Sequence, residues 1–276
     1  MKDRVIVAAI CLPVLFIILF YLPSYIFTAL IAIICAISAY ELLTAIWGEK
    51  SDRICIYAAF SAAIIPIGAH FDINNLVFPA VFLVLMSIMF VEAIAAFKTK
   101  KQIALSRILV ALFGGTLIPL MLSSLVSLKI MPEGRLLVLL PVISAFLTDA
   151  GAYFVGVFFG KRKAFPLVSP KKTVEGCIGG LITGAAVMLL YGVILVYTTF
   201  HNVEFWALIL YGVIGGVFTE LGDLAFSLIK REYNIKDYGR LLPGHGGILD
   251  RFDSMVFTAP AIYLLMSVIP AITIRN

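Results

Sequence analysis

The chain has 276 residues, of which 62% are hydrophobic and 13% are charged, and its formal net charge is +5. A soluble domain carries about 25% charged residues, so a water-soluble core of this size could not bury so much apolar surface. The mean hydropathy of +1.08 points the same way. The composition excludes an ordinary soluble protein, and we expect an all-α, polytopic integral membrane protein.

Apolar runs along the chain predict where it crosses the bilayer, which takes about 17–25 helical residues per crossing. The first run follows Lys2 and Arg4 and resembles a signal peptide, but it lacks a small-residue cleavage site, so we expect an uncleaved span. Turn residues such as Pro23 and Asp72 separate the runs. We expect about nine transmembrane helices, near 5–22, 25–47, 54–70, 73–97, 107–128, 136–159, 177–199, 205–229 and 250–273.

The basic residues predict how these spans are oriented. With a cytosolic N-terminus and alternating spans, 18 of the 21 Lys and Arg residues fall on the cytosolic side, as the positive-inside rule requires. Two basic loops, 160–176 and 230–250, then face the cytosol. We expect three parts with approximate boundaries: membrane helices over 1–70, further membrane helices over 71–135, and a C-terminal bundle over 136–276 that carries both loops.

Acidic residues inside the later spans are costly there and mark candidate functional positions. Spacings of three or four residues place Glu220 with Asp223, and Asp250 with Asp253, on shared helix faces, and Asp149 lies inside the sixth span. Oxygen ligands without a Cys or His cluster suit a hard cation such as Mg²⁺. The alternative is that each acid pairs with a Lys or Arg and only joins helices.

Two other acids, Glu41 and Glu92, lie close to the predicted cytosolic ends of their spans. There we expect local pairing or extension of the side chain toward the interface, without a site role.

The two basic loops carry the candidate anion-binding residues. In the first, Ser169, Lys171, Lys172 and Thr173 come just before a helix, where hydroxyls, backbone N–H groups and lysines favour an anion. The basic residues of 161–163 are better explained as an ordinary flank that contacts anionic lipid head groups. In the second loop, glycines at 244, 246 and 247 allow the backbone to approach a ligand closely.

The second loop and its flanks resemble the signature of the phosphatidate cytidylyltransferase family. The matching elements are Ser227, Lys230-Arg231, Lys236-Asp237, Gly239, Pro243, His245-Gly246-Gly247 and Asp250-Arg251-Phe252-Asp253. An upstream block also resembles the family: Asp149 to Tyr153, Gly160-Lys161, Ser169 to Thr173 and Glu175-Gly176. The chain departs from the family pattern at Val174, where Trp is usual, and at Phe226, where many members carry an acid.

The resemblance implies that the phosphate of phosphatidic acid attacks the α-phosphorus of CTP, giving CDP-diacylglycerol and pyrophosphate in phospholipid biosynthesis. The resemblance also suggests a homodimer. From the residues we expect Mg²⁺, with a second cation as an option, and a bacterial inner membrane with the active site facing the cytosol. No nucleic-acid partner is expected. The implied catalytic residues are Asp223, Asp250, Lys230, Arg231, Lys236, Asp237, His245 and Arg251. The implied substrate-binding residues are Ser169, Lys171, Lys172, Thr173, Ser227, Gly246 and Gly247. The implied metal ligands are Asp223, Asp250, Asp253 and Asp149.

Two other functions remain open at this point. A CTP-dependent polyprenol or lipid kinase would release CDP instead of pyrophosphate. A membrane ion or anion transporter would also use intramembrane carboxylates, but it predicts broken helices in two matching halves. The polar residues of this chain instead gather in its second half.

Overall fold

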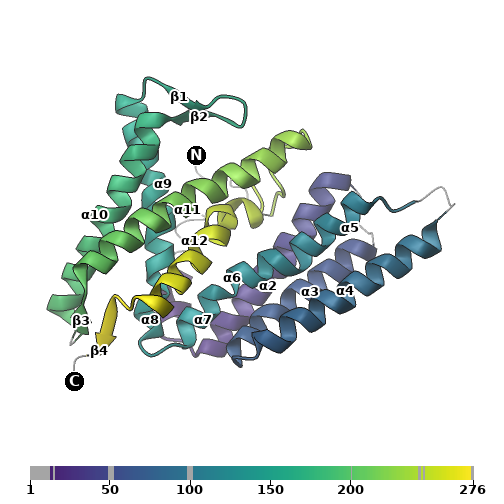
Figure 1. Cartoon of the computed structure of the whole chain (residues 1–276), viewed down its shortest axis with the longest axis horizontal. Coiled ribbons are helices and arrows are strands. Elements are labelled where there is room, and N and C mark those ends of the chain that lie inside the picture. The colour runs from purple at the N-terminus through teal and green to yellow at the C-terminus, as the bar shows by residue number, and fades with distance from the viewer. Residues whose placement is uncertain are drawn as a thin grey trace. The chain divides into compact units, whose positions relative to one another are not determined.

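The structure is a computed structural model that describes residues 13–14, 16–48, 53–97, 102–199, 201–241, 244 and 246–274. It is built almost entirely of helices, with two short two-stranded sheets (Figure 1). The chain forms two compact units. Unit 1 comprises Met1–Ile130 and Ile235–Phe252, and unit 2 comprises Met131–Asn234 and Asp253–Asn276.

Seven helical segments of the described residues are long and apolar enough to cross a membrane: Ser24–Trp47, Arg53–His70, Asn74–Ala96, Leu105–Ile130, Gly134–Phe159, Val174–Thr198 and Phe205–Glu232. They correspond to the second through eighth predicted spans. Half of the first predicted span lies outside the described residues. The ninth is not among the seven: it forms the helix α12 (Leu249–Val268), whose start carries Asp250, Arg251 and Asp253, followed by strand β4 (Ile272–Ile274). The all-α polytopic membrane class is confirmed.

Unit 1 packs four helical segments side by side (Figure 1). They are α2 (Ser24–Trp47), α3 (Arg53–His70), α4 (Asn74–Ala96) and a broken segment made of α5 (Leu105–Leu112), the π-turn Phe113–Leu117, α6 (Ile118–Leu122) and α7 (Ser124–Ile130). Residues buried between them include Leu43, Ala58, Leu85 and Met89. Gly115 lies at the π-turn, where a Cβ would come within 2.8 Å of the Leu85 side chain. The glycine therefore allows the broken segment to approach its neighbours closely.

Unit 2 is a helical group formed by the short α8 (Gly134–Leu137), α9 (Leu139–Phe159), α10 (Val174–Thr198), α11 (Phe205–Glu232) and the part of α12 that follows Phe252. Small residues let its helices approach closely, since a Cβ on Gly212 would lie within 2.5 Å of the Ala185 Cα atom. A hydrogen bond of 2.8 Å between the hydroxyls of Thr219 and Thr258 joins α11 to α12.

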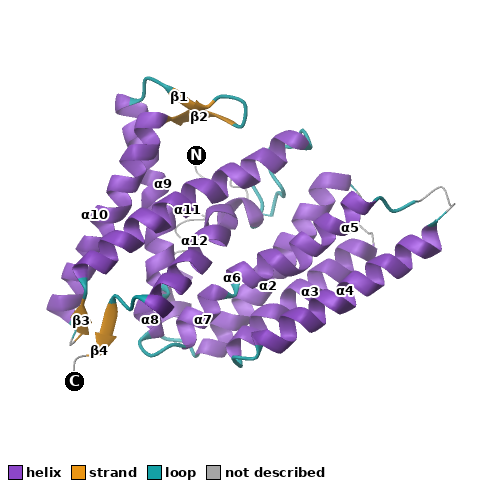
Figure 2. Ribbon diagram, viewed as in Figure 1, coloured by secondary structure: helices purple, strands orange, loops and turns teal. Residues whose placement is uncertain are grey.

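Two strand pairs lie at opposite ends of the α9–α11 group (Figure 2). The antiparallel pair of β1 (Lys163–Phe165) and β2 (Ser169–Thr173) occupies the first predicted basic loop. The second antiparallel pair joins β3 (His201–Val203) to β4. The sequence predicts a plain loop at 160–176, so the hairpin is a feature that only the structure reveals. It ends directly at the start of α10, which fixes where its basic side chains lie in unit 2.

Candidate functional site

The centre of the unit 2 site is a lysine held between two carboxylates. Lys172 Nζ lies 2.5 Å from Glu220 Oε2 and 2.7 Å from Asp223 Oδ2. Lys172 comes from β2, whereas both acids lie one turn apart on the same face of α11. The hairpin is therefore tied to α11 through charge, and one ammonium group balances part of the charge of two acids.

Burial and charge act in opposite directions on this lysine. Burial by itself would lower the pKa of the Lys172 ammonium, but the carboxylates of Asp223 and Glu220 outweigh it and raise the pKa above its ordinary value. Lys172 is therefore a fixed positive charge at neutral pH. A permanent cation in a partly buried site suits the binding of an anionic group.

A cavity of about 520 Å³ opens beside this cluster in unit 2. Asp149 from α9 lines it together with Lys171, Lys172 and Glu220. Asp149 Oδ2 accepts a hydrogen bond of 3.2 Å from the Ser254 hydroxyl of α12. Glu220 Oε1 is buried and has no hydrogen-bond partner among the described residues. The cavity thus combines lysines with carboxylates, one of which keeps a free acceptor atom.

The hairpin that carries Lys172 is held at its base by two local interactions. The Thr173 hydroxyl accepts a hydrogen bond of 3.1 Å from the Gly176 amide, which makes Thr173 the N-cap of α10. Glu175 Oε2 accepts the backbone N–H groups of Lys161 and Arg162 at 3.0 and 3.2 Å. These contacts place the hairpin relative to α9 and α10.

The last turn of α11 adds further cationic side chains to unit 2. Lys230 Nζ lies 3.7 Å from Asp253 Oδ2, and both side chains are largely buried. Asp253 Oδ1 also accepts the Ser254 amide at 2.8 Å. Arg231 Nε donates to the Val168 carbonyl in the hairpin at 3.2 Å. The cations at the end of α11 are therefore directed partly to an acid of α12 and partly to the hairpin.

The predicted signature residues from Lys236 to Phe252 belong to unit 1, where Asp250 organises the backbone. Asp250 Oδ2 accepts the N–H groups of Tyr238 at 2.8 Å and Gly247 at 2.9 Å. Gly246 has φ +85, in the left-handed region that favours glycine, and a Cβ there would also meet Asp250 Oδ2. The Asp250 carboxylate therefore holds the backbone at Tyr238 close to the backbone at Gly247.

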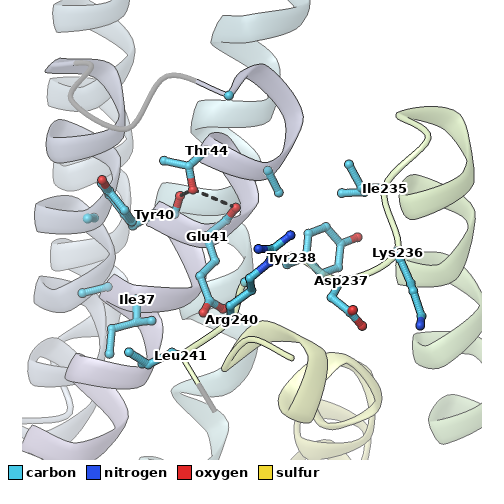
Figure 3. A pocket seen from close by; sticks show the side chains of 15 residues that line it. Ile37, Tyr40, Glu41, Thr44, Ile235, Lys236, Asp237, Tyr238, Arg240 and Leu241 are labelled. Atoms are coloured by element: carbon cyan, nitrogen blue, oxygen red, sulfur yellow. Dashed lines mark hydrogen bonds between the residues drawn. The ribbon is translucent and has the colours of Figure 1, made fainter. Parts of the chain in front are cut away.

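A larger cavity of about 1180 Å³ lies in unit 1 between α2 and the segment 235–241 (Figure 3). Figure 3 shows Tyr40, Glu41 and Thr44 on α2, with Lys236, Asp237, Tyr238 and Arg240 on the segment that faces them. Lys236, Asp237 and Arg240 are exposed, whereas Tyr238 is buried. The cavity therefore combines exposed charged side chains with aromatic and apolar walls.

Glu41 is buried in unit 1, whereas the sequence favours a side chain that extends toward the interface or pairs locally. Its Oε2 accepts the Leu249 amide at 2.9 Å, and the backbone of Ile248 also hydrogen-bonds to the carboxylate. The residue is only 6% exposed, so its side chain is buried and does not extend toward an interface. An acid within an otherwise apolar span was the sequence signal that could have identified it.

The donor chemistry near Lys172 fits a hard cation, since Asp149, Glu220 and Asp223 offer only carboxylate oxygens and Glu220 Oε1 has an unused acceptor. Within the described ranges, however, no group of three or more His, Cys, Asp or Glu side chains is arranged to hold a metal ion. The metal-ligand assignment stays a prediction.

The remaining predicted residues are placed as follows. Ser169 and Lys171 lie in β2, and Ser227 lies on α11 one turn after Asp223. Arg251 is exposed in the first turn of α12. His245 lies outside the described residues. Of the two departures from the family pattern, Phe226 is fully buried in unit 2 and Val174 is 40% exposed at the start of α10.

Comparison with known proteins agrees with the resemblance described above. A sequence model described as the Cytidylyltransferase family matches residues 2–269. Proteins named phosphatidate cytidylyltransferase are similar to the chain over 134 residues: 46% identical in Staphylococcus saprophyticus, 43% in Staphylococcus haemolyticus and 44% in Staphylococcus aureus. Each alignment covers 49% of this chain and 50% of the relative, so the chain spans about half the length of the curated relatives it matches. Because the family match extends over nearly the whole sequence, the chain belongs to the cytidylyltransferase family.

Proposed function

We propose that the protein is a phosphatidate cytidylyltransferase, which transfers the cytidylyl group of CTP to phosphatidic acid. The bond that forms joins a phosphate oxygen of the lipid to the α-phosphorus of CTP, and the bond that breaks releases pyrophosphate. Support comes from the family membership and from the names of the relatives, each of which aligns with this chain over half of the relative's length. The structural observation that carries the proposal is the Lys172 cluster, a permanent cation at the base of a basic hairpin next to a membrane helix.

The chemistry explains why such residues are needed. The reaction brings two anions together, and pyrophosphate leaves with additional charge, so cations near the phosphates stabilise the transition state. In this proposal Lys171 and Lys172 bind a substrate phosphate in unit 2, and Lys230 and Arg231 supply further positive charge there. The lipid phosphate is already an anion, so the residues need to position and neutralise it more than to remove a proton.

The segment in unit 1 contributes a second group of charges in this proposal. Lys236 and Arg251 neutralise phosphate oxygens, and Asp237 and Asp250 orient the neighbouring groups. Gly246 and Gly247 let the backbone come close to a substrate, and His245 contacts or positions a phosphate. Ser169, Thr173 and Ser227 orient the groups around the cavity of unit 2.

A divalent cation, with Mg²⁺ as the first choice, belongs to the proposal as a cofactor. In unit 2 the predicted ligands Asp223 and Asp149 would hold it, with Asp253 as a further candidate and Glu220 added because its Oε1 has an unused acceptor. In unit 1 the candidate ligand is Asp250. When bound, it would neutralise charge on phosphate oxygens.

We further propose that the protein lies in the inner membrane of a bacterial cell, with its cationic residues on the cytosolic side. CTP is a cytosolic substrate and the lipid phosphate lies at the interface, so the reaction needs a site open to both. The distribution of basic residues along the sequence supports this orientation. A homodimer is also part of the proposal.

A product assay tests the proposed function. Purified protein in detergent receives Mg²⁺, phosphatidic acid and CTP labelled in the cytosine. Transfer of the label into lipid with release of pyrophosphate is the expected result. Release of CDP with a phosphorylated lipid would instead show a lipid kinase. If folded protein uses no CTP in the presence of lipid and metal, the enzyme proposal fails, and flux measurements in vesicles would test transport.

A further inference from the structure

We propose that Glu41 is a positioning residue that, together with Asp250, holds residues 238–241 and 246–249 in their working conformation. The effect on catalysis rests on the proposed function, whereas the effect on the segment itself does not. No contact between Glu41 and a substrate is part of the inference.

The first observation is that Glu41 is directed at backbone amides. The side chain extends from α2 toward the segment 235–241 (Figure 3). Its carboxylate accepts the Leu249 amide, which is one of the N–H groups at the start of α12 that have no partner within the helix. Leu249 itself is fully buried. A carboxylate at this position satisfies a buried donor and favours the start of the helix through its charge.

The second observation is that the segment is shaped around this carboxylate. A Cβ added to Gly239 would collide with Glu41 Oε1, and a Cβ added to Gly247 would collide with Glu41 Oε2. Both collisions involve the same buried side chain, which approaches the segment at two positions eight residues apart. Glycine at 239 and 247 is therefore needed for Glu41 to fit, independently of any φ requirement.

The third observation is that Asp250 holds the same segment from within. It accepts the amides of Tyr238 and Gly247, whereas Glu41 accepts the next amides along the chain, those of Ile248 and Leu249. Asp250 is 7% exposed and Glu41 is 6% exposed, so both sets of bonds are largely shielded from water. Two carboxylates of like charge converge here because backbone N–H groups stabilise both.

The hydrogen bonds made by Glu41 and Asp250 also affect the side chains that come just before Tyr238. Lys236 and Asp237 are exposed on the wall of the unit 1 cavity and come directly before Tyr238, the first residue that Asp250 holds. If Glu41 is removed, the anchored end of the segment loosens and these side chains lose a defined position. A shift of about 1 Å in a positioning group can reduce a rate by about 100-fold.

The experiment compares Glu41 variants with matched variants of Glu92, an acid on α4 whose carboxylate accepts a 3.5 Å hydrogen bond from the Tyr57 hydroxyl. Turnover of CTP with phosphatidic acid is measured as kcat and KM. Glu41→Ala should reduce kcat by about 10- to 100-fold while KM changes by less than about threefold. Glu41→Gln keeps an acceptor oxygen for the Leu249 amide and should retain an intermediate kcat. Glu92→Ala and Glu92→Gln should behave like the wild type.

A double-mutant cycle tests the shape argument. Gly247→Ala alone should reduce kcat, because its Cβ displaces the Glu41 carboxylate. Added to Glu41→Ala, the same change should cost much less, because its collision partner is gone. The inference is wrong if Gly247→Ala lowers kcat by the same factor in the wild type and in Glu41→Ala. It is also wrong if Glu41→Ala has wild-type kcat in folded protein.

Hydrogen exchange provides a readout that needs no activity. In the substrate-free full chain, peptides covering 238–250 should exchange faster in Glu41→Ala than in the wild type, and peptides from α3 and α4 should not change. Faster exchange throughout the chain would show a general stabilising role and overturn the inference, as would unchanged exchange at 238–250. If the wild type shows no cytidylyl transfer, the proposed function fails, but the exchange result still decides the role of Glu41.

Discussion

The two units use buried or partly buried carboxylates in different ways. In unit 1, Glu41 and Asp250 accept backbone amides, so their charge maintains the conformation of a loop. In unit 2, Glu220 and Asp223 contact the ammonium group of Lys172, so their charge is balanced by a side chain that is itself a candidate substrate ligand. The same residue type can therefore set backbone geometry in one region and local charge in another.

The difference shows how a carboxylate can be assigned a role before any ligand is seen. Backbone N–H groups cannot move without moving the chain, so an acid bonded to them is committed to structure. A lysine side chain has several rotatable bonds and can exchange one anionic partner for another. On this basis the unit 2 carboxylates are better placed to change partners during a reaction than those of unit 1.

Removal of divalent metal should have the largest effect. We expect a chelator to reduce cytidylyl transfer by about 100-fold or more, and added Mg²⁺ to restore it, because charge on phosphate oxygens would otherwise be poorly neutralised. The Mg²⁺ concentration for half-maximal rate should rise in Asp223→Asn. If this Mg²⁺ concentration rose in Asp250→Asn and not in Asp223→Asn, the cation would belong to unit 1. The roles assigned to the carboxylates of the two units would then be reversed. Full activity without metal would remove the cofactor from the proposal.

Asp250 allows its structural and electrostatic roles to be separated. Both backbone amides reach the same atom, Oδ2, and the amide oxygen of Asn can accept them in its place. Asp250→Ala should lower kcat by at least about 100-fold through loss of the loop. If Asp250→Asn keeps near-normal kcat, the residue only shapes the loop, whereas a loss as large as that of Asp250→Ala shows that its charge is also required.

Lys172→Met should affect both stability and rate. It leaves two carboxylates without their cation in a site where the side chains of Lys172, Glu220 and Asp223 are 18%, 10% and 29% exposed. We expect a loss of roughly 2–4 kcal/mol, below the full cost for a wholly buried pair because some solvent reaches the site, and a lower melting temperature in detergent. Lys171→Met, at an exposed position, should not change the melting temperature.

Two controls refine this expectation. Adding Glu220→Gln to Lys172→Met should recover part of the melting temperature without recovering activity. Because the carboxylates raise the pKa of Lys172, its contribution is fully present below the unfolded value of 10.5 and is lost only as the pH rises through the folded pKa. The melting-temperature difference between wild type and Lys172→Met should therefore be the same at about pH 7 and about pH 9. A difference that shrinks between these values would contradict the assigned charge state.

Thr173→Ala should have the smallest effect. It removes the N-cap of α10 and should cost about 1 kcal/mol, whereas Thr173→Ser keeps the hydroxyl and should melt close to the wild type. Activity should fall only modestly in the alanine variant, because Glu175 still holds the base of the hairpin. A large loss of rate with unchanged melting would show that the Thr173 hydroxyl has a more direct role.

The sequence alone predicted the class of protein and most of its helices, because both depend on residues that are close together in the chain. Long apolar runs identify membrane helices, since each helix must satisfy its own backbone hydrogen bonds in lipid. Among the described residues, seven of the predicted runs correspond to helical segments long and apolar enough to cross a membrane. The pairing of Glu220 with Asp223 on one face followed from helical spacing alone. The family resemblance of the signature was confirmed by the match over residues 2–269.

The tertiary structure decided which groups the acidic side chains contact. Glu41 lies 208 positions before the amide it accepts, and no periodicity relates the two residues. Lys172 and Glu220 lie 48 positions apart in an unforeseen hairpin and a helix. Helix-forming and membrane-spanning tendencies depend on neighbouring residues in sequence, whereas the choice of which buried charge meets which donor depends on how distant segments pack. The sequence by itself therefore determined the class of protein, its helices and its family, and the packing determined what each acid does.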